Sequence, residues 1–232
     1  MKAHAHLAVE RDAAGRAVVR TLRSAAPLTL IPARGPAGVE PLVHLVNSAA
    51  SPLGGDELTL TVHVGPHACL TLTGIAATIA LPGPHGERSR TTVHLEVAEG
   101  ATVRYLPEPV VITRRARHES LLTVTLADGA HLHTRETVVL GRAGEAPGEL
   151  TTGLHVTRGD RPVLRQNLTV TAELLMGKRV LATELSTSDT GEVASGEWWS
   201  RTRLAAGGTL TTVLADDAVT ALGAAIRIGA GR

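Results

Sequence analysis

Apolar and polar residues alternate with a period of two along most of the chain. In the segment 57–64 every second side chain is apolar, and the positions between carry Glu, Thr or His. This is the pattern of a strand with one face in a core and the other in solvent. A corner at Gly65-Pro66 leads into a second alternating run, 69–73, so the sequence predicts a strand, a sharp turn and another strand.

The same pattern of strand, glycine corner and strand recurs three times downstream. The four instances contain Gly65, Gly100, Gly129 and Gly207, and the first three lie roughly 30 residues apart. Such a period is typical of stacked supersecondary units. A corner that leads one alternating strand into the next suits a β-solenoid or a two-layer stack of sheets, and a plain sandwich is the alternative.

The remaining segments complete an all-β prediction. Residues 4–10 and 16–24 are expected to form a hairpin, and further strands are expected at 28–32 and 42–47. In 216–226 an aspartate N-cap precedes apolar residues at helical spacing. The predicted fold is a β-helix-like stack of two sheets with one or two short helices, the main one near the C-terminus.

Composition and charge narrow the possible partners. The chain has 24 Gly and 12 Pro but no Phe, one Tyr and two Trp, so its core must be aliphatic. No linker interrupts the pattern, and residues 1–232 are expected to form a single domain. The formal net charge is +1 with acids and bases interspersed, so neither nucleic acid nor a membrane surface is expected as a partner.

Targeting signals and cysteine usage indicate a cytoplasmic protein. No apolar run reaches the roughly 18–20 residues that span a bilayer. The segment from Met1 to His6 lacks the apolar centre of a signal peptide. The single cysteine, Cys69, excludes an intrachain disulfide and fits a reducing compartment. We expect Cys69 to be a packed or partly exposed side chain rather than a nucleophile.

Histidine pairs are the first candidates for chemistry. The chain has eleven histidines, and His131 and His133 are two residues apart in a predicted strand. Residues at this spacing share a face, so both imidazoles are placed to contact one metal ion. The other interpretation is that both face solvent while Leu132 enters the core, since two histidines do not fill a coordination shell.

Patterns typical of enzymes are missing. The chain has no Gly-x-Ser-x-Gly nucleophile turn, and its glutamates are scattered along alternating strands without aromatic residues that could stack on sugars. Gly207-Gly208 is followed by neither a Lys-Ser/Thr pair nor a helix, so it is not a phosphate-binding loop. The sequence therefore predicts a protein that is not an enzyme.

Several motifs, taken in order, resemble a known family. The segment 103–112 contains Tyr-Leu-Pro-Glu-Pro, the third repeat follows it, and the segment 136–142 begins with Glu and ends with Gly-Arg. The Gly-Gly-Asp turn at 54–56 and the Thr-rich strand 70–73 match the N-terminal half of the same pattern. Together these motifs resemble the urease accessory protein UreD family, called UreH in some organisms. The segment 74–78 departs from it, lacking the usual Gln and Lys.

The resemblance implies a non-enzymatic, all-β scaffold for urease maturation. Members bind the apo-urease structural subunits and form a hetero-oligomeric complex with UreF and the GTPase UreG, which delivers nickel to the urease active site. No tightly bound cofactor is expected, and nickel would only be in transit through an interior passage lined by polar groups. The candidate residues for passage or partner contacts are Glu108, Glu136 and Arg142, and His131 and His133 are candidates for a transient nickel contact.

Two other classes of function stay open. A carbohydrate-active or carbohydrate-binding β-solenoid protein would need aromatic sugar platforms and often a secretion signal. A free-standing metal-binding protein would use the histidine pairs and hold nickel without partners.

Overall fold

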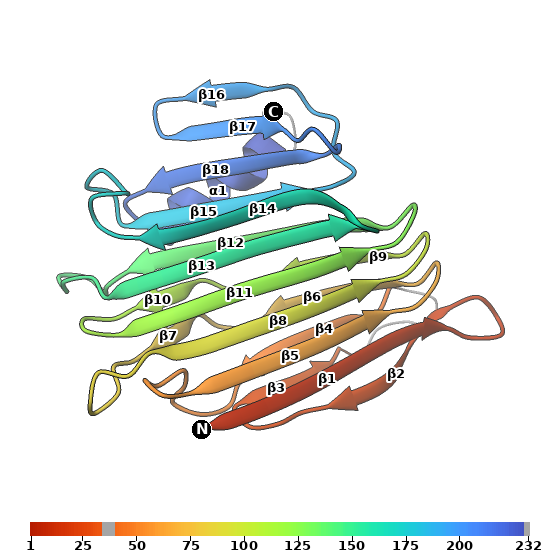
Figure 1. Ribbon diagram of the computed structural model, residues 1–232, viewed down its shortest axis with the longest axis horizontal. Coiled ribbons are helices and arrows are strands. Elements are labelled where there is room, and N and C mark those ends of the chain that lie inside the picture. The colour runs from red at the N-terminus through yellow and green to blue at the C-terminus, as the bar shows by residue number, and fades with distance from the viewer. Residues whose placement is uncertain (34–39, 230–232) are drawn as a thin grey trace.

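The computed structural model describes residues 1–33 and 40–229, and two β-sheets lie face to face in it (Figure 1). We call them sheet A and sheet B. In hydrogen-bonding order, sheet A consists of β14 (Arg161–Val170), β13 (Glu149–Arg158), β11 (Arg117–Leu126), β8 (Ser89–Val97), β5 (Glu57–Val64), β1 (Lys2–Arg11) and β2 (Ala17–Arg23). Sheet B consists of β16 (Ala194–Gly196), β17 (Trp199–Arg203), β18 (Thr209–Ala215), β15 (Val180–Ser186), β12 (His131–Leu140), β9 (Thr102–Leu106), β6 (Cys69–Gly74), β4 (Leu42–Asn47) and β3 (Leu28–Pro32). Two further short strands belong to it: β10 (Val110–Ile112) pairs with β12, and β7 (Thr78–Ala80) pairs with β10.

Successive strands pass from one sheet to the other, which confirms the predicted β-helix-like stack. The corners that lead from β5 to β6, from β8 to β9 and from β11 to β12 are the first three repeats of the sequence. Equivalent positions in these corners are His67, Gly100 and Gly129, with φ of 55°, 61° and 65°. Glycine adopts this left-handed conformation without the steric cost that a Cβ atom brings.

The corners also bond to one another. The backbone N–H of His67 donates to the carbonyl of Glu99 at 2.8 Å, and that of Gly100 donates to the carbonyl of Asp128 at 3.0 Å. Each corner therefore rests on the next, and the strands on either side are held in register.

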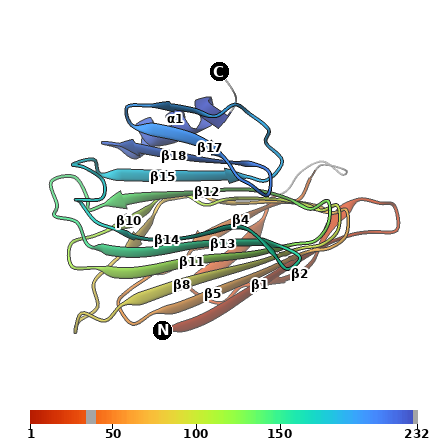
Figure 2. The same cartoon turned by 45° about the horizontal axis from the view of Figure 1, so that its top comes forward.

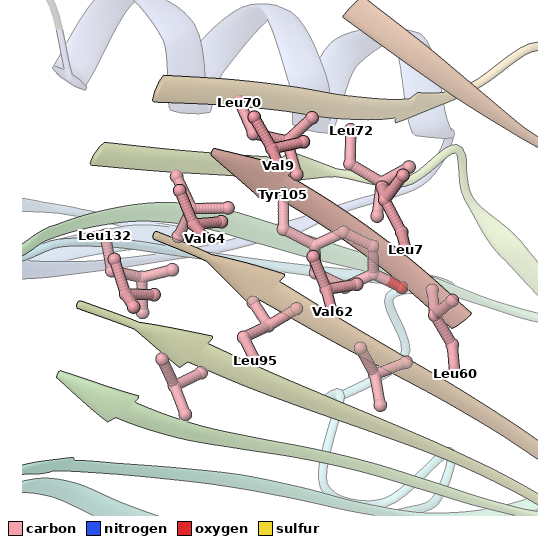
Figure 3. Packing of buried hydrophobic residues seen from close by; sticks show 14 of the residues in the cluster. Leu7, Val9, Leu60, Val62, Val64, Leu70, Leu72, Leu95, Tyr105 and Leu132 are labelled. Atoms are coloured by element: carbon pink, nitrogen blue, oxygen red, sulfur yellow. The ribbon is translucent and has the colours of Figure 1, made fainter. Parts of the chain in front are cut away.

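The strand register aligns similar apolar residues of neighbouring strands in the core. Val62, Leu95, Val124 and Val156 occupy one row across four parallel strands of sheet A. All four are buried, and they belong to a cluster that also holds inward residues of sheet B. Figure 3 shows part of this cluster, including Val62 and Leu95. The aliphatic core expected from the near absence of aromatic residues is thus built from stacked rows.

The fourth predicted repeat is wrong. The segment around Gly207 joins β17 to β18 as an antiparallel hairpin within sheet B and does not turn a corner between sheets. The N–H of Leu204 donates to the carbonyl of Gly208 at 3.0 Å, and the φ angles of Gly207 and Gly208 are 89° and 90°. A hairpin and a corner both need glycine between alternating strands, so the local sequence does not separate them.

Helix α1 (Ala218–Gly229) confirms the prediction of a helix near the C-terminus. It lies on the outer face of sheet B, over β15 and β18 (Figure 2), where Ala221 and Ala225 are buried. Asp217 caps it by accepting a hydrogen bond from the N–H of Thr220 at 2.8 Å. In the part of the chain that the structure describes, no helix combines the length and the apolar character that a bilayer crossing requires.

The apolar interior between the sheets is divided in two. One cluster includes Leu132 and a second includes Val138 and Leu140, all on the inward face of β12. Between them the same face carries Thr134 and Glu136. A band of polar side chains therefore crosses the core.

Candidate functional site

Sheet B is interrupted beside the polar band. Strand β12 pairs with β9 along 131–134 and with β10 along 138–140, and the intervening residues 135–137 have no strand partner on that side in the described structure. The chain facing this break is Pro107-Glu108-Pro109, between β9 and β10. A proline has no N–H to donate to a ladder, so the two prolines end one short strand and delay the next.

A cavity of about 140 Å³ lies between the sheets and reaches this break. Its lining includes Tyr105, His118 and Glu136, which face the interior, and also Glu108 and Arg135 at the break. A volume of this size holds several water molecules. The cavity therefore connects the polar band to the interruption in sheet B.

Glu136 is the central carboxylate of the cavity. Its Oε1 accepts a hydrogen bond from the Ser120 hydroxyl at 3.0 Å, and its Oε2 accepts one from the Thr152 hydroxyl at 2.7 Å. Both hydroxyls belong to sheet A, so the side chain bridges the two sheets. Burial raises the pKa of Glu136 above its usual range, although the two hydrogen bonds act against this shift.

Tyr105 lies in the wall of the same cavity. It is 8% exposed, and burial followed by the negative charge of Glu136 raises the pKa of its phenol. The chain's one tyrosine is thus enclosed and is not presented as a stacking surface for sugars.

Glu108 is held at the break by a close backbone approach. A Cβ atom built on Gly74 would lie 2.8 Å from Cγ of Glu108 and 2.9 Å from its backbone nitrogen. Only glycine leaves room for the Glu108 segment at this distance. The cavity therefore brings together two of the predicted residues, Glu108 and Glu136, from different strands and loops.

His118 is a cavity residue that the sequence analysis did not single out. It is 2% exposed, and its Nδ1 lies 2.9 Å from the Ser89 hydroxyl oxygen. Burial lowers the pKa of His118 to about 4, so the imidazole is neutral near pH 7. The sequence does indicate its position: His118 is an even number of residues from Val124 and Leu126, so on a strand it points to the same face as these core residues.

Three polar atoms near the break have no hydrogen-bond partner among the described residues. They are Nε of Arg135, Oγ1 of Thr137 and Oε2 of Glu184, and all are buried. Arg135 and Glu184 are cross-strand neighbours on β12 and β15. Buried polar atoms normally bond to protein or ordered water. These atoms are therefore free to bond to ordered water.

The other predicted residues lie elsewhere. His131 and His133 are both on the outward face of β12, opposite to Leu132, and neither lines the cavity. Nε2 of His133 is 2.8 Å from Oε1 of Glu184, while His131 is exposed.

Arg142 sits in an exposed turn. Its Nε donates to Oε2 of Glu145 at 2.9 Å, and it does not line the cavity.

The donor set of the cavity consists of carboxylate, hydroxyl and imidazole groups. Across residues 1–33 and 40–229, no three His, Cys, Asp or Glu side chains are grouped as metal ligands. The arrangement is chemically suited to hold water and to let a hydrated cation make successive weak contacts, since oxygen and imidazole donors both bind divalent ions.

The chain is similar in sequence to urease accessory proteins named UreD. The family model of the UreD urease accessory protein matches residues 1–190. Urease accessory protein UreD 1 of Saccharopolyspora erythraea is 51% identical to the chain, over 95% of the chain and 91% of that relative. Urease accessory protein UreD of Frankia alni is 35% identical, over 95% of the chain and 89% of the relative. The UreD protein of Parafrankia sp. (strain EAN1pec) is 41% identical, over 70% of the chain and 54% of the relative.

Proposed function

Since the chain belongs to the UreD family of urease accessory proteins, we propose that it is a non-catalytic scaffold for urease maturation in the cytoplasm. In this role it binds the urease structural subunits and, with UreF and the GTPase UreG, helps to deliver nickel to the urease active site. Nickel is the cargo of this process and not a resident cofactor. The scaffold acts as a single domain over its 232 residues.

The cavity is the observation that carries this proposal. It brings Glu108 and Glu136 to one polar space that crosses the core and reaches the break in sheet B. Polar side chains inside a β-sheet core cost free energy unless they are bonded or hydrated. Their presence along one continuous space is accounted for by the passage of a hydrated ion.

The residues divide into two groups by position. Glu136 and Glu108 contribute carboxylate oxygens inside the passage, and His118 contributes a neutral imidazole. Arg142, His131 and His133 lie outside the cavity, where we propose contacts with partner proteins or with nickel on its way to or from the passage.

Co-expression tests this function directly. The tagged chain is expressed with the urease subunits, UreF and UreG of its own organism, and urease activity is assayed with added nickel. Stable co-purification and urease activity that depends on the chain are expected. Full urease activity in its absence, without co-purification, would contradict the proposal.

Side-chain variants then distinguish residues that act in nickel passage through the cavity from residues that contact partner proteins. Glu136→Ala and Glu108→Ala are expected to lower urease activation while the complex still assembles. Glu192→Gln, at an exposed position outside the cavity, is the matched control and should activate normally. Normal activation by both cavity variants would remove the passage from the proposal, and loss of assembly with Arg142→Ala would assign Arg142 to a partner contact.

A further inference from the structure

Histidines gather on the outer face of sheet A, away from the cavity. This face alternates with the buried rows, and it carries five of the eleven histidines of the chain: His4, His6, His63, His94 and His155. The strands are parallel and in register from β1 to β13, so these side chains stand at fixed cross-strand positions.

Two of these imidazoles are in contact. The ring centroids of His6 on β1 and His63 on β5 are 5.1 Å apart, and the rings are tilted by 56°. A metal–nitrogen bond of about 2.0–2.1 Å puts a ring centroid about 3.2 Å from the ion, so two rings at a tetrahedral angle stand about 5 Å apart. The observed centroid separation matches this value, which is also an ordinary distance for two tilted rings in direct contact.

A carboxylate fixes the orientation of one ring. Nδ1 of His63 lies 2.8 Å from Oε2 of Glu96, on the neighbouring strand β8. A proton on Nδ1, donated to Glu96, leaves the lone pair of Nε2 free for a ligand, as in carboxylate–histidine–metal arrangements. His133 differs, because Glu184 occupies its Nε2.

The surface is hollowed on the His63 side of this pair. His63 and Glu96 line a shallow depression, together with Glu10 and small residues such as Ala8 and Gly65, and His6 stands outside that lining. Small side chains leave space for water ligands of an ion, and the carboxylate of Glu96 lowers the cost of bringing a cation there, while Glu10 is paired with Arg20 at 3.7 Å. The positive charge of Arg23, directly opposite His6 on β2, raises the cost of bringing a cation there.

We propose that His6 and His63 form an open site for a divalent transition-metal ion on the outer face of sheet A, with Glu96 as the orienting carboxylate. Imidazole nitrogens suit Ni²⁺, Cu²⁺ and Zn²⁺, and water completes the coordination shell. With two protein ligands the ion exchanges readily. The proposal does not depend on the function proposed above, because metal binding is measured on the chain without partners.

Equilibrium dialysis of the untagged full chain against Ni²⁺ at pH 7.5 tests the site. The double variant His6→Ala/His63→Ala is expected to bind one Ni²⁺ fewer than the parent chain at the same free concentration. Glu96→Gln is expected to weaken this site roughly 10- to 100-fold, as loss of an outer carboxylate usually does. Circular dichroism and thermal unfolding verify that each variant is folded.

A histidine on the same face serves as the control. Nε2 of His155 is 2.8 Å from Oδ1 of Asn167 on β14, so His155→Ala should leave the His6–His63 site intact. Arg23→Gln should tighten it. An unchanged Ni²⁺ isotherm in the His6→Ala/His63→Ala variant, or no binding by the parent chain, would overturn the proposal. If the double variant does not fold, an unchanged isotherm for Glu96→Gln overturns it instead.

Discussion

The carboxylate of Glu136, on β12 of one sheet, accepts a hydrogen bond from the hydroxyl of Thr152, on β13 of the opposite sheet, at 2.7 Å. This contact, with the parallel one from Ser120, places an ionisable group between two apolar clusters. Burial of Glu136 at this position lowers the free energy of unfolding when its carboxyl is charged. The same carboxyl is the polar centre of the cavity.

Replacement of this carboxyl by an amide is expected to stabilise the protein at neutral pH. Because burial raises the native pKa of Glu136, the native state holds a proton that the unfolded state releases, and stability falls as pH rises above the unfolded pKa. Glu136→Gln removes this loss. The free energy of unfolding of this variant should equal that of the parent chain below about pH 4, apart from any constant offset. Above that pH the difference should grow in favour of the variant, by roughly 1.4 kcal/mol in total for each unit by which the native pKa is raised.

Urea unfolding between pH 4 and pH 8 measures this difference. Glu192→Gln, which is exposed, should show no such growth with pH. A Glu136→Gln variant that is less stable than the parent chain at every pH would show that the buried charge is fully compensated.

His118 is expected to produce the opposite pH dependence. Its pKa is lowered from 6.5 to about 4 by burial, so the unfolded state takes up a proton between these values while the native state does not. Stability is therefore lost as pH falls from about 6.5 to 4, by about 3 kcal/mol when the shift is fully expressed. Relative to the parent chain, His118→Gln should become more stable over this interval, as measured by thermal unfolding in matched buffers. A difference that does not vary with pH would contradict the buried neutral imidazole.

Gly74 and Glu108 are expected to be energetically coupled. In Gly74→Ala the new methyl group meets both Cγ and the backbone nitrogen of Glu108, so a destabilisation of about 1–3 kcal/mol is expected. Part of this strain should disappear when the Glu108 side chain is shortened. A double-mutant cycle of Gly74→Ala with Glu108→Ala should therefore give a combined loss smaller than the sum of the single losses. Strict additivity would show that the Glu108 segment moves away freely.

The two adjacent glycines of the β17–β18 hairpin should differ in their response to alanine. Both have φ near +90°, so each substitution costs about 1–2 kcal/mol of backbone strain. A Cβ on Gly207 meets nothing within 4 Å, whereas a Cβ on Gly208 meets the backbone carbonyl of Ser186. Gly208→Ala should therefore be the more destabilising variant by at least about 1 kcal/mol in urea unfolding. Equal losses would mean that the hairpin adjusts without cost.

Much of the fold could be predicted because its determinants are local. Alternation with period two gave the strands, and the glycines at Gly100 and Gly129 lie where a left-handed corner is needed. The error at Gly207 arose because the partner of a strand, in the same sheet or the opposite one, depends on contacts far along the chain. Local residues do not encode that choice.

The site was predictable only in part. Glu108 and Glu136 came from the family motif, and the structure brings them to one cavity. His118 could have been predicted only by noting that this polar residue falls on the same face of its strand as the core residues. The contact between His6 and His63 was not predictable from pairs close in sequence, because it joins strands β1 and β5 across 57 positions.

The stacked corners have a consequence for how the chain can change its length. Because each corner bonds to its immediate neighbours and each core row continues through the next strand, a coil is coupled mainly to the coils on either side. Nearest-neighbour coupling of this kind allows a whole coil to be gained or lost while the others keep their geometry. Insertions and deletions among homologous chains should therefore be tolerated best as complete coils of roughly 30 residues or as extensions of the exposed turns between them, and least within a strand, where a shift of one residue exchanges the core face for the solvent face.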